Sequence, residues 1–314
     1  MFFESSIAKS PKELSELAKG AGMKPISYSQ FSLFSTCPFA WKSKYVDNIK
    51  DDSYSIHLLF GSAMHTVIQE YITLFYKKGG AIADEMNFDN RLLTEMAQEF
   101  EKAKEGLPEN LQDFTTQTEM IEFYRQGLEI LYTLRKNRGD YFTKKDWELV
   151  GIETPILINT DSNPGVAFIG FIDIILKDVK RRRYKIIDLK TSTRGWGAKD
   201  KASLLKSAQL ILYKKYYAKQ FGIDPNSIDI EFLILRRMIF EGSEFPMKRL
   251  QRHCPASGKP TINKVERMLV EFVNTFDDKG NVKPDATFPK TVGDGCKYCF
   301  YGAYNICDKN KPKK

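Results

Sequence analysis

The chain lacks the features of membrane-spanning, secreted and motor proteins. No stretch approaches the ~20 consecutive apolar residues that a membrane helix needs. The first residues carry no basic segment followed by an apolar one, so we expect no secretory signal. No G-x-x-x-x-G-K-[ST] sequence occurs, which excludes a motor of the P-loop type in this chain. Internal repeats and low-complexity blocks are absent as well.

Histidine and cysteine are scarce: the 314 residues include three histidines and five cysteines. In an intracellular protein of this size, five cysteines favour metal binding or catalysis over a disulfide framework. Hydrophobic residues make up 42% and aromatic residues 13% of the chain, which is enough for a folded core. The formal net charge of +8 suits a polyanionic partner, although this signal is weak alone.

The sequence pattern changes along the chain and predicts an α/β protein with a helical front section. Residues 1–25 are a polar lead-in, and residues 26–147 have mainly helical periodicity. Short β-branched runs, which predict strands, occupy 149–153, 166–176, 184–189 and 228–235. Further helices are expected at about 200–221 and 261–277. We therefore expect sections at 1–25, 26–147, 148–250 and 251–314.

Within the helical section, three helices carry apolar faces. Ser27 or Ser29 can cap the first, which runs towards Cys37. A second helical piece holds Trp41. The third has an apolar stripe with a spacing of about 3.6 residues, made of Phe60, Met64, Val67, Tyr71 and Leu74.

Two predicted strands carry charged residues among apolar ones. Alternation places Asp173 on the same strand face as Ile169, Phe171 and Ile175. A bare carboxylate on such a face costs several kcal/mol unless a cation or a donor meets it. In the next strand Asp188 and Lys190 are two residues apart, so both side chains leave one face. The alternative reading is an Asp–Lys pair on an exposed strand.

The two strands are joined by a polar turn, 178–183. A hairpin that is symmetric about residues 180 and 181 places Asp173 opposite Asp188. Facing like charges are destabilising, so the arrangement suggests a divalent cation between them. Oxygen ligands hold Mg²⁺, which can activate water against a phosphodiester, and Lys190 can stabilise the negative charge that develops.

The pattern Gly170-x-x-Asp173, followed by Ile-Ile-Asp188-x-Lys190-Thr, resembles the PD-(D/E)XK nuclease superfamily. It is most similar to the RecB-like branch, which includes the AddB nuclease domain and the CRISPR-associated iron–sulfur exonucleases. Ile172 stands where the proline of the superfamily name would be. The resemblance implies a restriction-endonuclease-like core, a central mixed sheet flanked by helices, within residues 148–250.

The resemblance also implies a metal site and a role for each matching residue. His65, in Gly-Ser-Ala-Met-His, resembles the helix histidine that ligates Mg²⁺ or Mn²⁺ together with Asp173 and Asp188. Lys190 would position or activate the water. Read alone, His65 is interpreted by default as a core histidine beside the buried stripe.

Three further positions match the family with weaker signals. Gln209 and Tyr213 resemble a Q-x-x-x-Y motif whose residues contact substrate or support the site. As an i,i+4 pair they can also simply pack on one helix face. Glu153 resembles the acidic residue of the preceding strand, or is a surface acid at the strand end.

The C-terminal section carries a cysteine array, Cys296-x-x-Cys299 followed by Cys307. Three thiolates leave a four-coordinate site one ligand short, and Cys37 is the candidate fourth ligand. Cys254 fits no spacing and is expected to be a spare thiol. The array resembles the [4Fe–4S] staple that ties the two chain ends of such nucleases together, with zinc or unliganded cysteines as the alternatives.

Basic residues cluster at 177–183, 199–206 and 236–237 and are candidates for phosphate contacts. Trp196, just after the second charged strand, either stacks on an unpaired base or packs on the core. The helical section either arches over the DNA path or only covers the sheet.

Taken together, the resemblance implies a Mg²⁺- or Mn²⁺-dependent DNA exonuclease acting on single strands or ends. The alternatives are a flap or junction endonuclease and a non-catalytic subunit that binds DNA ends. A helicase or recombination partner is compatible with either reading. The expected location is the cytoplasm or nucleoid of a bacterial, archaeal or phage-infected cell, with no membrane association.

Overall fold

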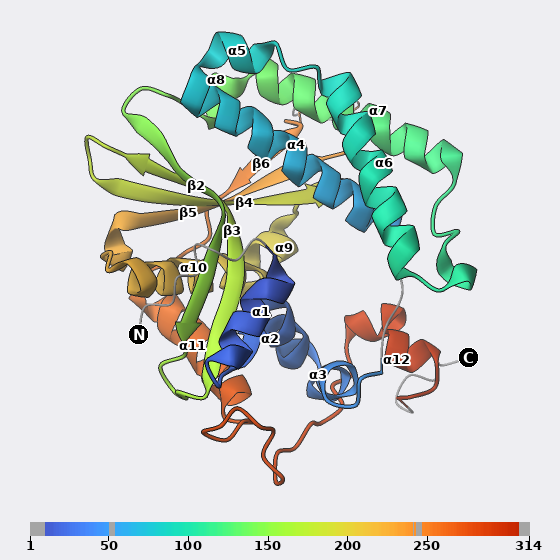
Figure 1. Ribbon diagram of the computed structural model, residues 1–314, viewed down its shortest axis with the longest axis vertical. Helices are drawn as coiled ribbons and strands as arrows, with labels where there is room; N and C mark the ends of the chain where they lie inside the picture. The colour runs from blue at the N-terminus through green and yellow to red at the C-terminus, as the bar shows by residue number, and fades with distance from the viewer. Residues whose placement is uncertain (1–9, 50–53, 241, 243–246, 308–314) are drawn as a thin grey trace.

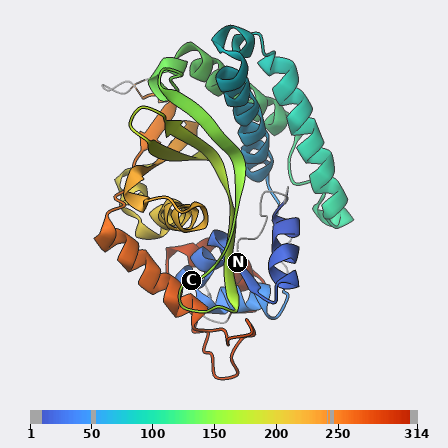
Figure 2. The same ribbon diagram turned by 60° about the vertical axis from the view of Figure 1, so that its left-hand side comes forward.

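A mixed β-sheet forms the centre of the molecule in the computed structural model, which describes residues 10–49, 54–240, 242 and 247–307 (Figure 1). Within these residues the sheet has six strands: β1 (Lys24–Ser27), β2 (Trp147–Asn159), β3 (Val166–Asp178), β4 (Arg183–Ser192), β5 (Ile228–Arg236) and β6 (Leu250–His253). Helices cover both faces of the sheet (Figure 2). The predicted central mixed sheet flanked by helices is confirmed.

The segments with predicted helical periodicity are helical, and further helices are present. In chain order they are α1 (Pro11–Gly20), α2 (Tyr28–Thr36), α3 (Pro38–Tyr45), α4 (Ile56–Lys78), α5 (Gly80–Asp84), α6 (Phe88–Gly106), α7 (Gln117–Lys136), α8 (Arg138–Tyr141), α9 (Ala198–Ala202), α10 (Leu204–Phe221), α11 (Lys259–Val273) and α12 (Phe300–Ala303). Ser27 caps α2 by accepting a hydrogen bond from the Gln30 N–H at 3.4 Å. None of these helices is long and apolar enough to cross a bilayer.

Two helical layers enclose the sheet. On one face α4, α6 and α7 pack over β3, β4 and β5, and the predicted stripe of α4 is buried there except for the partly buried Leu74. On the other face α10, α11, α2 and α3 form the second core, which includes Trp41 and Ile175. The helical section therefore covers the sheet, which was one of the two expected arrangements.

Strand β3 has neighbours on both edges, but one edge is interrupted. Strand β2 runs antiparallel along nearly the whole of β3. On the opposite edge, β1 pairs in parallel with Val166–Ile169, and β4 pairs antiparallel with Ile174–Asp178. Among the described residues no strand pairs with 170–173 on this edge. The result is a notch in the sheet between β1 and β4.

The β3–β4 register agrees with the symmetric hairpin expected from the sequence. The last pair before the notch joins Ile174 and Ile187, which are the chain neighbours of Asp173 and Asp188. Beyond this pair the strands separate. Asp173 and Asp188 would form the next pair of this register, but regular pairing stops just before them.

Helix α1 and the strands β1 and β6 were not predicted from the sequence. Helix α1 and the first half of β1 lie in residues 1–25, which we interpreted as a lead-in. Only Leu14 and Ala18 of α1 are buried, so the apolar face of this helix is short. Strands of four residues, such as β1 and β6, are too short to show alternation.

The N-terminal and C-terminal parts of the described chain contact each other near α3. The Phe39 N–H donates to the Pro289 carbonyl at 3.2 Å, and Lys290 Nζ lies 4.8 Å from the centre of the Phe39 ring. The Tyr301 hydroxyl of α12 donates to the Ile49 carbonyl at 3.3 Å. These contacts join the segments that carry Cys37 and the C-terminal cysteines.

Candidate active site

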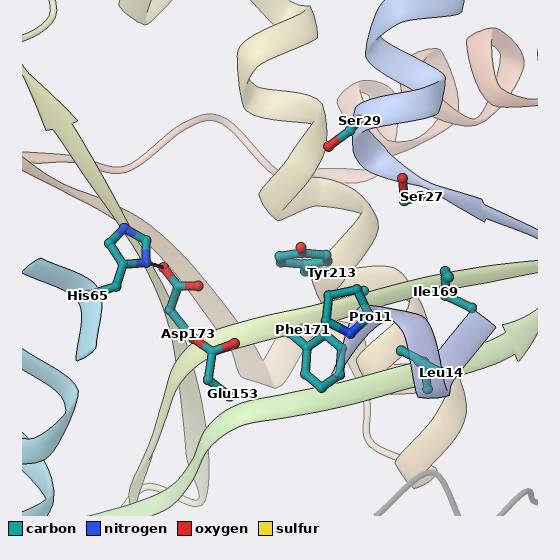
Figure 3. A pocket seen from close by; sticks show the side chains of 11 residues that line it. Pro11, Leu14, Ser27, Ser29, His65, Glu153, Ile169, Phe171, Asp173 and Tyr213 are labelled. Atoms are coloured by element: carbon teal, nitrogen blue, oxygen red, sulfur yellow. Dashed lines mark ion pairs between the residues drawn. The ribbon is translucent and has the colours of Figure 1, made fainter. Parts of the chain in front are cut away.

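A pocket of about 400 Å³ opens at the notch between β1 and β4 (Figure 3). Its walls come from α1, β1, α2, α4, β2, β3 and α10. The lining residues are Pro11, Leu14, Ser27, Ser29, His65, Glu153, Ile169, Gly170, Phe171, Asp173 and Tyr213. Four of the positions that the sequence singled out therefore meet in one cavity: His65, Glu153, Asp173 and Tyr213.

One nitrogen and two carboxylate oxygens converge at one end of this pocket. Ligand atoms of His65, Glu153 and Asp173 all lie within 4.8 Å of one another. His65 Nδ1 and Asp173 Oδ2 are 3.5 Å apart. Burial lowers the pKa of His65, which favours the neutral imidazole that a metal requires. The donor set suits a divalent cation such as Mg²⁺ or Mn²⁺.

Glu153 joins the donor group because of an unusual backbone conformation. Its φ of +46° lies in the left-handed region, where a non-glycine residue is strained. The flanking ladder pairs, Ile152–Ile174 and Thr154–Ile172, bracket Glu153 opposite Asp173. Its exposed carboxylate therefore faces the acid of the neighbouring strand.

Gln69 holds this carboxylate in place. Its side-chain Nε2 donates a hydrogen bond to Glu153 Oε1. Gln69 is buried and stands four residues after His65 on the same face of α4. Sequence reasoning missed Gln69, although the i,i+4 spacing from His65 was a signal that it faces the same strands.

The Asp173 side chain replaces a backbone hydrogen-bond acceptor where the β3–β4 ladder ends. Its Oδ2 accepts a hydrogen bond from the Leu189 N–H at 2.7 Å. Burial raises the pKa of Asp173 to about 7, and the charge of Lys190 and the Leu189 hydrogen bond only partly offset this. The carboxylate is thus fixed in position, and burial favours its protonated form more than in an exposed aspartate.

Asp188 and Lys190 lie together, as their spacing on β4 predicted. Lys190 Nζ is 2.8 Å from Asp188 Oδ2, and only 1% of the Asp188 surface is exposed. Burial raises the pKa of Asp188 to about 6 despite the opposing effect of Lys190. Burial alone would lower the pKa of Lys190, but Asp188 and Asp173 raise it overall, so its amine stays cationic.

The predicted set of metal ligands and the observed donor group differ in one member. Asp188 has no oxygen among the ligand atoms that lie within 4.8 Å of one another, and Glu153 takes its place in the group. Asp188 is nevertheless close enough to influence the pKa of His65. Metal ligation by Asp188 remains a prediction, and Glu153 is the stronger candidate of the two acids in this structure.

Tyr213 and Gln209 support the site from α10. The Tyr213 ring lies directly against Gly170, where an added Cβ would be 2.9 Å from Tyr213 Cε1. Gln209 Nε2 donates to the Tyr213 hydroxyl at 3.4 Å. Tyr213 lines the pocket, whereas Gln209 does not. Glycine at 170 is therefore required by the close approach of the tyrosine.

The cysteines lie on the segments that meet near α3. Cys37 precedes α3 and Cys299 precedes α12, while Cys296 and Cys307 flank α12 more distantly. Among the described residues no three cysteine sulfurs lie within 4.8 Å of one another. A zinc ion with Zn–S bonds of about 2.3 Å holds its sulfurs about 3.8 Å apart. The cysteines are thus not arranged as a closed zinc site, and cluster binding remains a prediction.

Trp196, Arg183 and Arg237, three of the other candidate contacts, are engaged within the protein. The Trp196 ring packs 4.8 Å from Phe232, which agrees with the core-packing alternative. Arg183 pairs with Asp229 at 2.6 Å. Arg237 is only 6% exposed and lies over the Phe123 ring, so its guanidinium is not a surface group.

The chain was compared with protein families, curated proteins and solved structures. The sequence profile described as "PD-(D/E)XK nuclease superfamily" matches residues 25–307. No curated protein matches the chain. Among solved structures, the chain is similar to a "putative exonuclease" from Eubacterium rectale, with 12% sequence identity and a TM-score of 0.47. That match covers 92% of this chain and 97% of the other.

Proposed function

Because the chain belongs to the PD-(D/E)XK nuclease superfamily, we propose that it is a divalent-metal-dependent deoxyribonuclease that removes nucleotides from single strands or DNA ends. The observation that supports this best is the convergence of His65, Glu153 and Asp173 in an open pocket. The Asp188–Lys190 pair lies beside this group on the neighbouring strand. A nitrogen and oxygen donor set next to a cationic amine is suited to hydrolysis of a phosphodiester.

Different residues of the site would bind the metal and orient the attacking water. His65 and Asp173 would hold Mg²⁺ or Mn²⁺, with Glu153 and Asp188 as the further carboxylates. A divalent ion bound there supplies Lewis-acid polarisation of the phosphoryl group. Lys190, kept cationic by its two acidic neighbours, would orient the attacking water and stabilise the charge that develops on the phosphate.

Tyr213 and Gln209 would position the substrate. The buried hydroxyl of Tyr213, whose pKa is raised by burial, stays protonated and can donate to a phosphate oxygen. Gln209 orients this hydroxyl through its own hydrogen bond. Tyr213 would contact the scissile nucleotide directly, and Gln209 would act through Tyr213.

The test is nucleotide release from end-labelled single-stranded DNA in the presence of Mn²⁺ or Mg²⁺. We expect release by the wild-type chain and a loss of about 10²–10³-fold in kcat in Lys190→Ala, the magnitude associated with one charge-stabilising group. Lys42→Ala, which removes a lysine paired with Asp47 at 2.7 Å outside the pocket, is the matched control and should retain activity. No metal-dependent release by the wild type would contradict the proposal.

A closed circular single strand distinguishes end processing from internal cutting. An exonuclease leaves the circle intact and degrades the linear form, whereas an endonuclease cuts both. RNA of the same sequence tests the preference for DNA. Because this chain has no P-loop motif, a helicase or recombination enzyme in the same cell compartment would supply its single strands.

We also propose that Cys37, Cys296, Cys299 and Cys307 hold a structural [4Fe–4S] cluster. The contacts between the α3 and α12 segments support a staple between the chain ends. Anaerobically purified protein is expected to be brown and to contain iron, and Cys299→Ser should lose both properties and stability. Zinc content without iron would overturn the cluster assignment.

A further inference from the structure

The pocket extends beyond the candidate metal ligands His65, Glu153 and Asp173. Building on the proposed nuclease function, we propose that this extension is a subsite for one unpaired nucleobase, which stacks on Phe171. Phe171 lines the pocket together with Asp173 (Figure 3). The subsite would restrict cleavage to nucleotides that have left a duplex.

The position of Phe171 on β3 fits one nucleotide next to the reacting phosphate. It stands two residues before Asp173, so its side chain leaves the same strand face about 7 Å away. It also belongs to the segment 170–173, where no described strand covers the edge of β3. An aromatic face is therefore open towards the cavity beside the donor group.

The chemistry of the walls suits a base, which has apolar faces and polar edges. One side is apolar, with Pro11 and Leu14 of α1 next to Phe171. The opposite side presents the hydroxyl groups of Ser27 and Ser29. The volume of about 400 Å³ lies within the range of small-ligand pockets.

Phe171 is less buried than the apolar residues of the cluster against which it packs. Leu14 and Ile169 are 0% and 7% exposed, as expected for core residues. Phe171 is only partly buried, and its free surface faces the pocket. Stacking on an aromatic ring is independent of base identity, so the subsite would select unpaired over paired nucleotides without reading sequence.

The test combines a substrate change with a protein change. Single-stranded oligonucleotides carry an abasic residue at each of the first three positions from the attacked end, and kcat/KM is measured with Mn²⁺. At one of these positions the abasic residue should lower kcat/KM of the wild type about tenfold, because one stacked base is lost. On intact DNA, kcat/KM of Phe171→Ala should be about tenfold below that of the wild type, and the abasic residue should lower it no further. Phe171→Trp should behave as the wild type.

Two control variants separate loss of the aromatic ring from a general effect on folding. Phe171→Leu retains apolar bulk without an aromatic face and should show the same insensitivity to the abasic residue as Phe171→Ala. Phe100→Ala removes a similarly half-buried ring that packs on Phe114 away from the pocket, and should retain the wild-type sensitivity. Equal abasic losses in the wild type and in Phe171→Ala would overturn the assignment.

A binding measurement separates this subsite from the proposed function. Fluorescence of a terminal 2-aminopurine is recorded in Ca²⁺, which replaces Mn²⁺ without requiring turnover. Quenching by the wild type and its loss in Phe171→Ala would support the subsite even if hydrolysis were absent. Absence of quenching in an active wild-type enzyme would overturn the subsite and leave the nuclease function intact.

Discussion

The side chain of Asp173 accepts the backbone N–H of Leu189 at 2.7 Å, just beyond the last backbone pair between β3 and β4. This contact lets the two strands separate without leaving the Leu189 donor unsatisfied. The separation opens the notch, and the same carboxylate faces His65 and Glu153 in the pocket. One residue therefore both shapes the sheet and contributes to the candidate metal-binding group.

The raised pKa of Asp173 predicts a pH-dependent stability of the metal-free protein. The pKa of about 7 lies above the ordinary 3.8, so between these values the folded chain holds a proton that the unfolded chain releases. The free energy of unfolding must then fall as pH rises through this window, by about 1.4 kcal/mol per pH unit. Asp173→Asn retains the acceptor for Leu189 and should melt several degrees above the wild type at pH 8, with little difference at pH 4.

Thermal melts in EDTA at pH 4, 6 and 8 measure this difference. Asp161→Asn is the control with the opposite sign, because Asp161 is paired with Lys215 and Lys219 at 2.5 Å and its loss should lower stability at pH 8. An Asp173→Asn variant that is less stable than the wild type at pH 8 would contradict the buried, proton-holding carboxylate.

The hydrogen bond from Gln69 to Glu153 predicts a second effect on metal binding. Gln69→Leu removes the donor that holds the Glu153 carboxylate and should weaken Mn²⁺ binding about 10- to 100-fold, the usual cost of losing a group that orients a ligand. Isothermal titration calorimetry measures the affinity directly.

A purely structural role for Gln69 gives a different result. Gln251→Leu removes an amide of similar burial that bonds the Trp196 backbone away from the donor group. This control should lose stability with unchanged Mn²⁺ affinity. If both variants behave in the same way, Gln69 does not position Glu153.

The close approach of Tyr213 to Gly170 predicts a steric conflict. Gly170→Ala places a methyl group 2.9 Å from a ring that is almost fully buried, so the ring or β3 must move. We expect a loss of about 1–3 kcal/mol in stability and reduced kcat. Gly139→Ala, where no atom lies within 4 Å of the new Cβ, should be neutral.

A double-mutant cycle identifies the cause. Tyr213→Leu shortens the side chain, so the added methyl in Gly170→Ala should cost less in this background than in the wild type. Additive losses in chemical denaturation would show that the two residues do not conflict.

The sequence predicted much of the site because the hairpin is regular. A short symmetric turn fixed the register that places Asp173 beside Asp188, and alternation placed Phe171 on the same face as Asp173. Alternation failed for Ile175, which packs under α10, because β3 changes its neighbours at the notch.

The residues that sequence reasoning missed depend on tertiary contacts. Gln69 meets Glu153 because α4 packs on β2, and its i,i+4 spacing from His65 does not by itself identify this partner. The left-handed backbone of Glu153, opposite Asp173, is likewise not predicted by its residue type. Local spacing identified the candidate residues, whereas the packing of α4 on the sheet decides which of them lie close together.

The central claim is that His65, Glu153 and Asp173 bind one divalent ion at the notch. Crystals soaked in Mn²⁺ and measured for anomalous scattering test it most directly. We predict a single strong peak about 2.0–2.3 Å from one atom of each of the three side chains. A peak at Asp188 without Glu153, or no peak in the pocket, would contradict the account.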